Sequence, residues 1–330
     1  MNSFNLINDI IQNNNKFVIT THVNPDGDAI GSELALARYL EKLGKEVRII
    51  NHSPTPQFLL FLLGNNEEIE LFDSSKHAEL ISSSDVIFSL DLNQLSRAGS
   101  MEEELRTSKA KKVCIDHHEF PEEFADVMLI DTNKSSTGEI IYNFLINSNF
   151  QIDYDVALPL YVAIITDTGS FRFDRTTPDV HRLTAQLLET GIDPKFVYRE
   201  VYEQGTANRI QLLGIALSSL TIADEGKISY MVISKSDLTK TETDEEDVEG
   251  FVNYNLTIKG VEVGIFFFEM DDVVKVSFRS VKKVPVNELA KRFNGGGHFH
   301  AAGARIHGLE LKSAIEKVLN EANKFVKEYK

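Results

Sequence analysis

The feature that most constrains the fold is the alternation of apolar strands with helical patterns over the first 190 residues. Short apolar runs predict strands at residues 16–21, 46–50, 85–90, 112–115 and 127–130. Between most of them, as over residues 29–43, apolar side chains recur at helical spacing. Alternating strands and helices form a parallel sheet that helices cover on both faces. The sequence therefore predicts an α/β N-terminal domain.

The pattern then changes along the chain. The run 156–166 predicts a core helix, Thr177-Pro178 predicts a helix start, and two further helices are expected over 194–203 and 206–219. Strands are expected at 227–233, 261–269 and 273–280, an exposed helix start at 244–249, and an amphipathic helix over 312–330. We therefore expect a parallel-sheet domain over 1–190, a helical linker over 191–220 and a smaller mixed α/β domain over 221–330.

Composition excludes several classes of protein. The formal net charge of −16 argues against a protein that coats long nucleic acid with a basic face. The sequence has no run of about 20 apolar residues, and its start lacks the pattern of a signal peptide. The only cysteine, Cys114, excludes an intramolecular disulfide. These features predict a cytoplasmic protein without membrane contact.

A polar loop between the first strand and helix carries one histidine and two aspartates. His22, Asp26 and Asp28 fall within seven residues, and Asp26 and Asp28 would lie on one side of an extended loop. Imidazole and carboxylate donors together suit a divalent cation such as Mn²⁺. A Pro-Asp-Gly turn with Asp28 as a helix cap explains the same residues equally well.

Other predicted core elements end in similar groups. Asp91 follows one strand, Asp116-His117-His118 ends another, and Asp167 follows the apolar run 156–166. Asp91 alone would more often be a turn residue, and Asp167 could simply end a helix. However, the carboxyl ends of parallel strands meet at one edge of a sheet, which favours a common site. Two histidines and four aspartates suffice for two cations if one aspartate is shared.

A glycine-rich segment lies in the predicted C-terminal domain. Gly296 and Gly297 precede His298 and His300, and such glycines let a backbone approach an anion closely. A plain flexible loop is the alternative. Basic residues nearby in sequence favour phosphate recognition, and Arg97, just beyond Asp91, could reach the same substrate. The basic residues are Arg279, Lys282, Lys283, Lys291, Arg292 and Arg305.

Together these motifs resemble the DHH phosphoesterase family, which is named for the motif found here as Asp116-His117-His118. The loop from His22 to Ser32 resembles its first motif, and Gly-Gly-Gly-His298 resembles the signature of the DHH-associated domain. The resemblance implies that His22, Asp26 and Asp91 hold one Mn²⁺. It implies a second cation on Asp28, Asp91, His117 and Asp167; Mg²⁺ or Co²⁺ could replace Mn²⁺.

Size and layout are most similar to the bacterial oligoribonuclease and 3′,5′-bisphosphate nucleotidase branch of that family. The resemblance implies hydrolysis of very short RNA, linear dinucleotides and adenosine 3′,5′-bisphosphate by a two-metal-activated hydroxide. His118 would act at the scissile phosphate. We expect Asp116 to orient an imidazole. Substrate contacts are implied for Arg97, Arg279, His298 and His300, and are expected for Gly296 and Gly297.

Three alternatives stay open at this point. An inorganic pyrophosphatase shares the N-terminal motifs, but is expected to carry a lysine- and arginine-rich signature in its second domain. A processive single-strand exonuclease of the same superfamily would be longer. A non-catalytic nucleotide sensor would be expected to lack some ligand positions. No binding to long duplex nucleic acid is expected, and the sequence is compatible with a homodimer.

Overall fold

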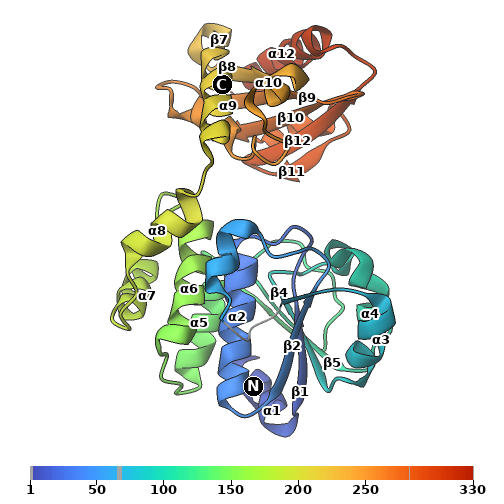
Figure 1. Ribbon diagram of the computed structural model, residues 1–330, viewed down its shortest axis with the longest axis vertical. Helices are drawn as coiled ribbons and strands as arrows, with labels where there is room; N and C mark the ends of the chain where they lie inside the picture. Colours follow the sequence, from blue (N-terminus) through green and yellow to red (C-terminus); the bar gives the residue numbers. More distant parts are fainter. Residues whose placement is uncertain (1–2, 65–68, 282, 330) are drawn as a thin grey trace. The chain divides into compact units, whose positions relative to one another are not determined.

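The computed structural model describes residues 3–64, 69–281 and 283–329, without the side chain of His298. The chain divides into two compact units that meet between Gln204 and Gly205. Each unit has its own sheet and its own hydrophobic core, and each is described below by itself (Figure 1).

Unit 1 is built around a parallel sheet of six strands in the order β3-β2-β1-β4-β5-β6. The strands are β1 (Lys16–Thr20), β2 (Glu46–Asn51), β3 (Ile69–Leu71), β4 (Val86–Leu90), β5 (Lys111–Asp116) and β6 (Val127–Ile130). The helices are α1 (Ser3–Asn13), α2 (Gly27–Lys42), α3 (Ser74–Ser83), α4 (Glu102–Thr107), α5 (Thr137–Asn147), α6 (Tyr154–Asp167), α7 (Pro178–Leu188) and α8 (Pro194–Tyr202). Two 3₁₀ helices, η1 (Gln57–Leu62) and η2 (Leu95–Met101), complete the unit.

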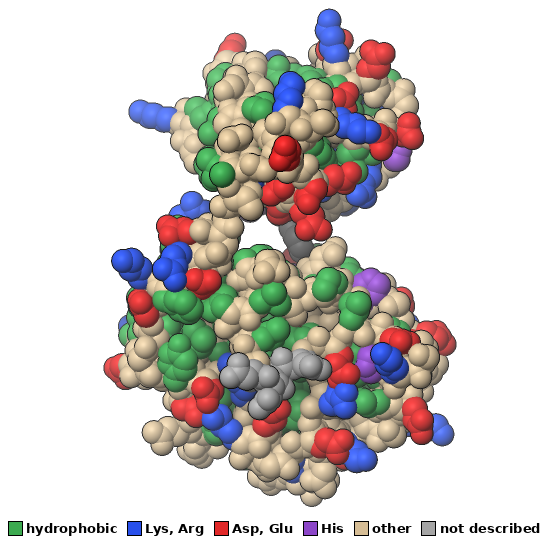
Figure 2. Space-filling model, viewed as in Figure 1, with side chains coloured by type: hydrophobic (Ala, Val, Ile, Leu, Met, Phe, Trp, Pro, Cys, Tyr) green, Lys and Arg blue, Asp and Glu red, His purple; other side chains and the backbone are tan. Residues whose placement is uncertain are grey.

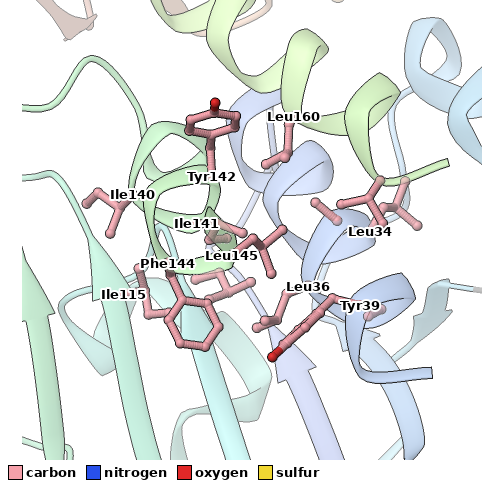
Figure 3. Close-up of a cluster of buried hydrophobic side chains, with 14 of the residues drawn as sticks. Leu34, Leu36, Tyr39, Ile115, Ile140, Ile141, Tyr142, Phe144, Leu145 and Leu160 are labelled. Atoms are coloured by element: carbon pink, nitrogen blue, oxygen red, sulfur yellow. The ribbon is translucent and has the colours of Figure 1, made fainter. Parts of the chain in front are cut away.

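Both faces of this sheet are covered, as the sequence predicts. Within β1, Phe17 and Ile19 belong to the core on one face, whereas Val18 belongs to the core on the other. Helices α2, α5 and α6 lie on one side of the sheet and α3 and α4 on the opposite side (Figure 1). Figure 3 shows side chains from α2, α5, α6 and β5, among them Ile115, that belong to the larger core. The strand predictions were confirmed to within about two residues, but β3 was missed because it has only three residues.

A glycine allows the two central helices of the larger layer to pack closely. A Cβ atom added to Gly31 of α2 would lie 2.4 Å from the carbonyl oxygen of Pro159 in α6. This distance is far shorter than any ordinary contact, so glycine is required there if the helices are to keep their spacing. The close packing fixes the start of α2, which carries Asp28, relative to α6, which ends at Asp167.

Unit 2 has a mixed six-stranded sheet in the order β11-β12-β10-β9-β8-β7. Its strands are β7 (Thr221–Ala223), β8 (Ile228–Ile233), β9 (Val263–Glu269), β10 (Val273–Ser280), β11 (Gly296–His298) and β12 (Ala301–His307). Its helices are α9 (Ala207–Ser218), α10 (Lys235–Thr241), α11 (Val286–Lys291) and α12 (Leu311–Glu328), with 3₁₀ segments η3 (Asp224–Gly226) and η4 (Phe251–Thr257). Among the described strands of unit 2, only β8 and β9 pair in parallel, so this sheet is mixed, as expected.

The expected helix start at residues 244–249 was wrong. That segment forms bends and turns, and the next helical segment is η4. The Asp244 backbone N–H donates to Asp247, and the Glu246 backbone N–H donates to Asp244. Aspartate side chains that satisfy nearby backbone N–H groups compete with helix formation, which explains the turn.

Two further observations bear on broad classes of function. Among the described residues, none of the helices is both long and apolar enough to cross a membrane. Figure 2 shows acidic and basic side chains interspersed over the face in view rather than a continuous basic surface. Any recognition of phosphate on that face would therefore have to be local.

Candidate active site

The predicted site lies where the sheet of unit 1 changes its winding direction. From β1 the chain continues outward through β2 and β3, whereas β4, β5 and β6 extend the sheet on the other side of β1. Loops at the carboxyl ends of strands beside such a point form the ligand sites of doubly wound sheets. His22 follows β1, Asp91 follows β4 and Asp116 ends β5, so all three lie at this edge.

Asp91 lies at the centre of the cluster. Its carboxylate is 3.2 Å from His22 Nε2, 3.6 Å from His117 Nε2 and 3.3 Å from His118 Nδ1. The Thr137 hydroxyl donates to Asp91 Oδ1 at 2.9 Å. Burial disfavours the charged carboxylate, but the His118 and His22 side chains hold the pKa of Asp91 well below its usual value. Asp91 is therefore an anion shared by three imidazoles.

His117 points its Nε2 atom at the remaining carboxylates. That atom lies 3.3 Å from Asp167 Oδ2 and 3.7 Å from Asp28 Oδ2. It is buried and has no hydrogen-bond partner among the described residues. On the other side of the ring, Nδ1 lies 3.3 Å from the carbonyl oxygen of Lys134. With its proton on Nδ1, the ring would present the Nε2 lone pair to the carboxylate cluster, as metal-ligating histidines do.

The predicted ligand residues come together in groups suited to metal binding. Ligand atoms of His22, Asp26 and Asp91 lie within 4.8 Å of one another, and the same holds for Asp28, His117 and Asp167. A third such group joins Asp91 to His117 and His118. Because these groups share Asp91 and His117, they form one continuous cluster rather than separate sites.

The N-terminus of α5 holds Asp28, which the sequence did not reveal. Asp28 is fully buried and accepts the backbone N–H groups of Thr137 at 2.7 Å and Gly138 at 2.9 Å. Unpaired N–H groups at a helix start favour a negative charge in this way. Ser136, with Glu139 three residues later, resembles a capping box in the sequence and predicts a helix start, which the structure confirmed. The Glu139 carboxylate accepts the Ser135 backbone N–H and hydroxyl. The contact with Asp28 joins distant segments, so no local sequence pattern indicates it.

The residue that caps α2 is Asp26. The turn alternative had named Asp28 as that cap. The Asp26 carboxylate accepts the N–H groups of Asp28 and Ala29, so Asp26 is the N-cap of α2. Asp28 lies in the first turn of the helix. Capping of α2 therefore explains the presence of Asp26, whereas the buried carboxylate of Asp28 binds the N-terminus of α5.

The cluster carries more negative charge than its histidines can balance. Burial, followed by the charges of Asp91, Asp167 and Asp26, raises the pKa of Asp28 well above its usual value. Burial, followed by the charges of Asp91 and Asp26, raises the pKa of Asp167 to about 8. Divalent cations would relieve this repulsion. Together with the unpartnered His117 nitrogen, this charge imbalance shows that the residues fit a metal centre.

His118 is held differently from His117, although the centres of the two rings lie only 4.5 Å apart. Asp116 Oδ1 lies 2.8 Å from His118 Nδ1 and also accepts the His118 backbone N–H. Burial lowers the tendency of this ring to ionise, but Asp116 and Asp91 outweigh it and raise the pKa of His118 to about 10. The ring is thus a cation at neutral pH whose orientation is fixed by a buried carboxylate.

A second buried carboxyl group supports the loop before His22. Glu33 of α2 accepts from Asn51 Nδ2 at 2.8 Å, and Asn51 Oδ1 accepts the Thr21 backbone N–H at 3.3 Å. The second Glu33 oxygen and the Thr21 hydroxyl are buried without hydrogen-bond partners among the described residues. Burial raises the pKa of Glu33 to about 8, so it is largely protonated at neutral pH.

This group predicts a pH-dependent stability. In the unfolded chain Glu33 loses its proton near its ordinary pKa of 4.5, whereas the folded chain holds the proton up to about pH 8. Stability from this group is therefore complete at low pH and is lost as the pH rises from about 5 to about 8. The free energy of unfolding of Glu33→Gln, relative to that of the wild type, should rise by roughly 1 kcal/mol per pH unit across that range.

Urea unfolding of the metal-free protein, followed by circular dichroism at pH 6 and pH 8, checks this prediction. Glu123→Gln, at an exposed position in the same unit, serves as the control and should show no such trend. A constant stability difference between Glu33→Gln and the wild type at the two pH values would show that Glu33 is ionised in the folded protein.

Arg97 adjoins the cluster through its backbone. The Val23 N–H donates to the Arg97 carbonyl oxygen at 2.8 Å, which ties η2 to the loop that carries His22. The Arg97 side chain is half-buried. Its position beside this loop is compatible with the substrate contact that the resemblance implies.

The predicted substrate-binding residues of unit 2 gather at one end of its sheet. Arg279 of β10 pairs in register with Ala301 of β12, which in turn pairs with His298 of β11. His300 Nδ1 lies 3.0 Å from the Ser280 hydroxyl. Arg279 lines a small hollow with Glu249, Lys275 and Ser277. Burial lowers the pKa of Arg279 despite the charge of Glu249.

The glycines in this region have distinct structural reasons. Gly297 has a φ of 139°, and a Cβ atom there would lie 2.5 Å from the Ala301 carbonyl oxygen, so the β11–β12 pairing itself requires glycine. A Cβ atom at Gly296 would meet nothing within 4 Å, and the residue is exposed. The backbone at Gly296 is therefore open to solvent, and a ligand could approach it.

Part of the basic cluster inferred from the sequence is engaged in ion pairs. Arg292 bonds Glu321 at 2.6 Å and Glu328 at 2.8 Å and packs 4.7 Å over the Phe325 ring. Lys291 pairs with Glu288 at 2.8 Å. Arg292, which follows α11, is thus bound to α12, whereas the Lys291 pair lies within α11. Because both of these cations are in ion pairs, Arg279 is the best candidate of the three for phosphate recognition. Lys282 lies outside the described residues.

Comparison with known proteins agrees with this geometry. The N-terminal domain model of the DHH family matches residues 16–164, and the DHHA1 domain model matches residues 225–328. A protein of Thermus thermophilus described as a bifunctional oligoribonuclease and PAP phosphatase is 32% identical over 91% of this chain and 87% of its own length.

The chain belongs to the DHH family. A crystal structure of an exopolyphosphatase-related protein from Bacteroides fragilis has the same fold, with a TM-score of 0.93 and 32% identity over 98% of this chain and 97% of the other. The nuclease RecJ of Thermus thermophilus, solved with Mn²⁺, shares 14% identity and a TM-score of 0.57, with 98% of this chain and 54% of RecJ covered. The RecJ likeness concerns the fold alone. The DHH triplet is thus Asp116, His117 and His118, at the end of β5.

Proposed function

We propose that this chain is a divalent-cation-dependent phosphoesterase that hydrolyses very short oligoribonucleotides, linear dinucleotides and adenosine 3′,5′-bisphosphate. The observation that carries the proposal is the placement of Asp91 between His22, His117 and His118 at the switch point of the sheet. The similarity to the Thermus relative, described as an oligoribonuclease and PAP phosphatase, supports the choice of substrates.

Two cations, most simply Mn²⁺, would bind to this cluster. His22, Asp26 and Asp91 would hold one, and Asp28, Asp91, His117 and Asp167 would hold the other. Such cations would supply positive charge that activates water and neutralises phosphate oxygens. Mixed imidazole and carboxylate donors suit Mn²⁺, although they also accept Mg²⁺ or Co²⁺.

The surrounding residues would position and protonate the substrate. His118 would donate a proton to the leaving oxygen, because its ring is cationic and Asp116 fixes its orientation. In unit 2, Arg279 would bind a substrate phosphate through its guanidinium. Backbone N–H groups at Gly296 and Gly297, together with His298 and His300, would complete that subsite. Arg97, beside the loop that carries His22, would bind phosphate in unit 1.

The free cysteine of the chain is compatible with a reducing compartment. Cys114 is buried, and burial raises the pKa of its thiol well above the usual value, so it is an unreactive core residue. We propose that the protein acts in the cytoplasm, where short RNA and nucleotides are available. A homodimer would appear in size-exclusion chromatography as twice the chain mass of 37.1 kDa.

Hydrolysis of a defined substrate panel with Mn²⁺ tests the proposed activity. The panel contains inorganic pyrophosphate, adenosine 3′,5′-bisphosphate, RNA of two to five nucleotides and an RNA of 20 nucleotides. We expect turnover of the bisphosphate and of the shortest RNAs, with little on the 20-mer and none on pyrophosphate. Chelation of divalent cations should abolish it, and added Mn²⁺ should restore it.

Other outcomes point to the alternatives. Turnover of pyrophosphate alone would assign the chain to pyrophosphate hydrolysis and remove the role of the glycine-rich segment. Processive digestion of the 20-mer would make it a single-strand exonuclease. Binding of nucleotides without any turnover, in protein that also lacks metal, would favour a nucleotide sensor.

A further inference from the structure

The loop after Asp167 has an unusual backbone and an exposed aromatic ring. Gly169, Ser170 and Phe171 have successive φ values of 55°, 56° and 66°, a left-handed conformation that is costly for residues other than glycine. The turn brings the chain back so that Phe173 projects from the loop with 52% of its surface exposed. A strained backbone and an exposed aromatic ring, both just after Asp167 of the candidate metal centre, are together typical of a binding site.

The loop is held rigidly despite its exposure. The Thr168 carbonyl oxygen accepts the N–H groups of Arg172 at 2.9 Å and Phe173 at 3.0 Å. The Thr168 side chain is buried and accepts the Phe171 N–H at 3.1 Å. A Cβ atom on Gly169 would lie 2.5 Å from the Phe173 ring, so the backbone at this glycine lies directly against the ring. The ring is thus fixed in place by the turn beneath it.

Two arginines give the loop a positive charge next to the candidate metal centre. The Arg172 guanidinium lies 5.8 Å from the centre of the Phe173 ring, and its Nε donates to the Gly169 carbonyl oxygen. Arg175 Nη1 lies 3.3 Å from His117 Nδ1, which places the far end of the loop against the cluster. An exposed ring with one guanidinium beside it, and a second between the loop and the cluster, matches a ligand with an aromatic base and a phosphate.

We infer that Phe173 is a stacking platform for a nucleobase of the substrate, with Arg172 directed at an adjacent phosphate. This inference rests on the proposed function and deepens it, because it assigns base recognition to a loop of unit 1. The exposed part of the ring would stack on any base, so the platform would recognise nucleotides as a class without reading sequence.

Equilibrium binding separates base stacking from catalysis. In the Mn²⁺-loaded protein, calorimetry would compare adenosine 5′-monophosphate with its base-free counterpart ribose 5-phosphate. For Phe173→Leu we expect affinity for adenosine 5′-monophosphate to fall about tenfold, the effect of losing one stacked base. Affinity for ribose 5-phosphate should stay unchanged, and Phe173→Tyr should keep wild-type affinity for both.

Two further variants serve as comparisons. Phe196 carries Arg199 at the same 5.8 Å distance but packs its ring against Phe61, so Phe196→Leu is the matched control and should change neither affinity. Phe120, 81% exposed and two residues beyond His118, is the competing platform. Loss of base-dependent binding in Phe120→Leu instead of Phe173→Leu would overturn the inference.

The remaining outcomes also discriminate. An equal fall in affinity for both ligands in Phe173→Leu would show that the ring only supports the loop, and would overturn the inference while leaving the proposed function intact. Conversely, the substrate panel tests the proposed function independently. Wild-type protein that hydrolyses no member of the panel would overturn that function, whatever Phe173 does to binding.

Discussion

Asp91→Ala is expected to lower hydrolysis of adenosine 3′,5′-bisphosphate more than about 1000-fold. The carboxylate lies between His22, His117 and His118, so its loss removes the ligand that the two cations would share. Cation stabilisation of a phosphoryl transition state contributes several kcal/mol, and about 4 kcal/mol corresponds to a factor of 1000 in rate. Steady-state kinetics with saturating Mn²⁺ measures the effect.

Two variants guard this prediction against a trivial loss of folding. Asp91→Asn can still accept the Thr137 hydroxyl, so it should fold, as judged by circular dichroism, and be nearly as inactive. Asp179→Ala removes an exposed aspartate that pairs with Arg182, and it should retain full activity. Turnover near the wild-type rate in a folded Asp91→Asn or Asp91→Ala protein would exclude the shared-ligand role.

His118→Gln is expected to lower kcat about 100- to 10,000-fold without loss of bound Mn²⁺. The loss follows from removal of a positioned acid, because Asp116 holds the His118 ring and its pKa is raised to about 10. A phosphoester with a p-nitrophenolate leaving group needs little protonation, so the same variant should lose much less activity on it. Kinetics on both substrates, with metal analysis of the protein, distinguishes the acid from a ligand.

The exposed histidine of α7, His181, provides the matched control, and His181→Gln should behave as the wild type. If His118→Gln slows both substrates equally and also loses Mn²⁺, His118 is a metal ligand instead. That outcome would be compatible with the third group of possible ligand residues, in which His118 joins Asp91 and His117.

Much of the site was predictable because its chemistry lies at the ends of strands. His22, Asp91 and His117 each follow a strongly apolar strand, and parallel strands bring their carboxyl ends to one edge. No pairing information was needed beyond the strand–helix alternation. The same logic predicted the sheet and its two helical layers from the apolar pattern alone.

Other contacts of the candidate site could not be predicted from local sequence patterns, because these contacts join segments that are distant in the sequence. The N–H groups of Thr137 and Gly138 reach Asp28 across 109 and 110 residues, and no sequence spacing encodes that approach. The capping pattern at Ser136 predicts the start of α5, but it does not predict that the first N–H groups of α5 bind Asp28. Likewise, Glu33 belongs to an apolar helix face that predicts only packing, whereas the structure buries it against Asn51.

The prediction of a helix start at residues 244–249 was wrong for a different reason. Its acidic residues have no apolar periodicity to fix a helix, and Asp244 and Asp247 bond nearby backbone groups in a turn. Local hydrogen bonding therefore outweighed helix propensity. In the loop after Asp167, the three successive left-handed residues were equally invisible, since only Gly169 signals such a conformation in sequence.

Anomalous diffraction from crystals grown with Mn²⁺ tests the central claim most directly. The account predicts two manganese peaks in unit 1, roughly 3.5–4 Å apart. One would lie against His22 and Asp26, the other against Asp28, His117 and Asp167, and Asp91 would contact both. A single peak, or two peaks that do not share Asp91, would contradict the two-metal account.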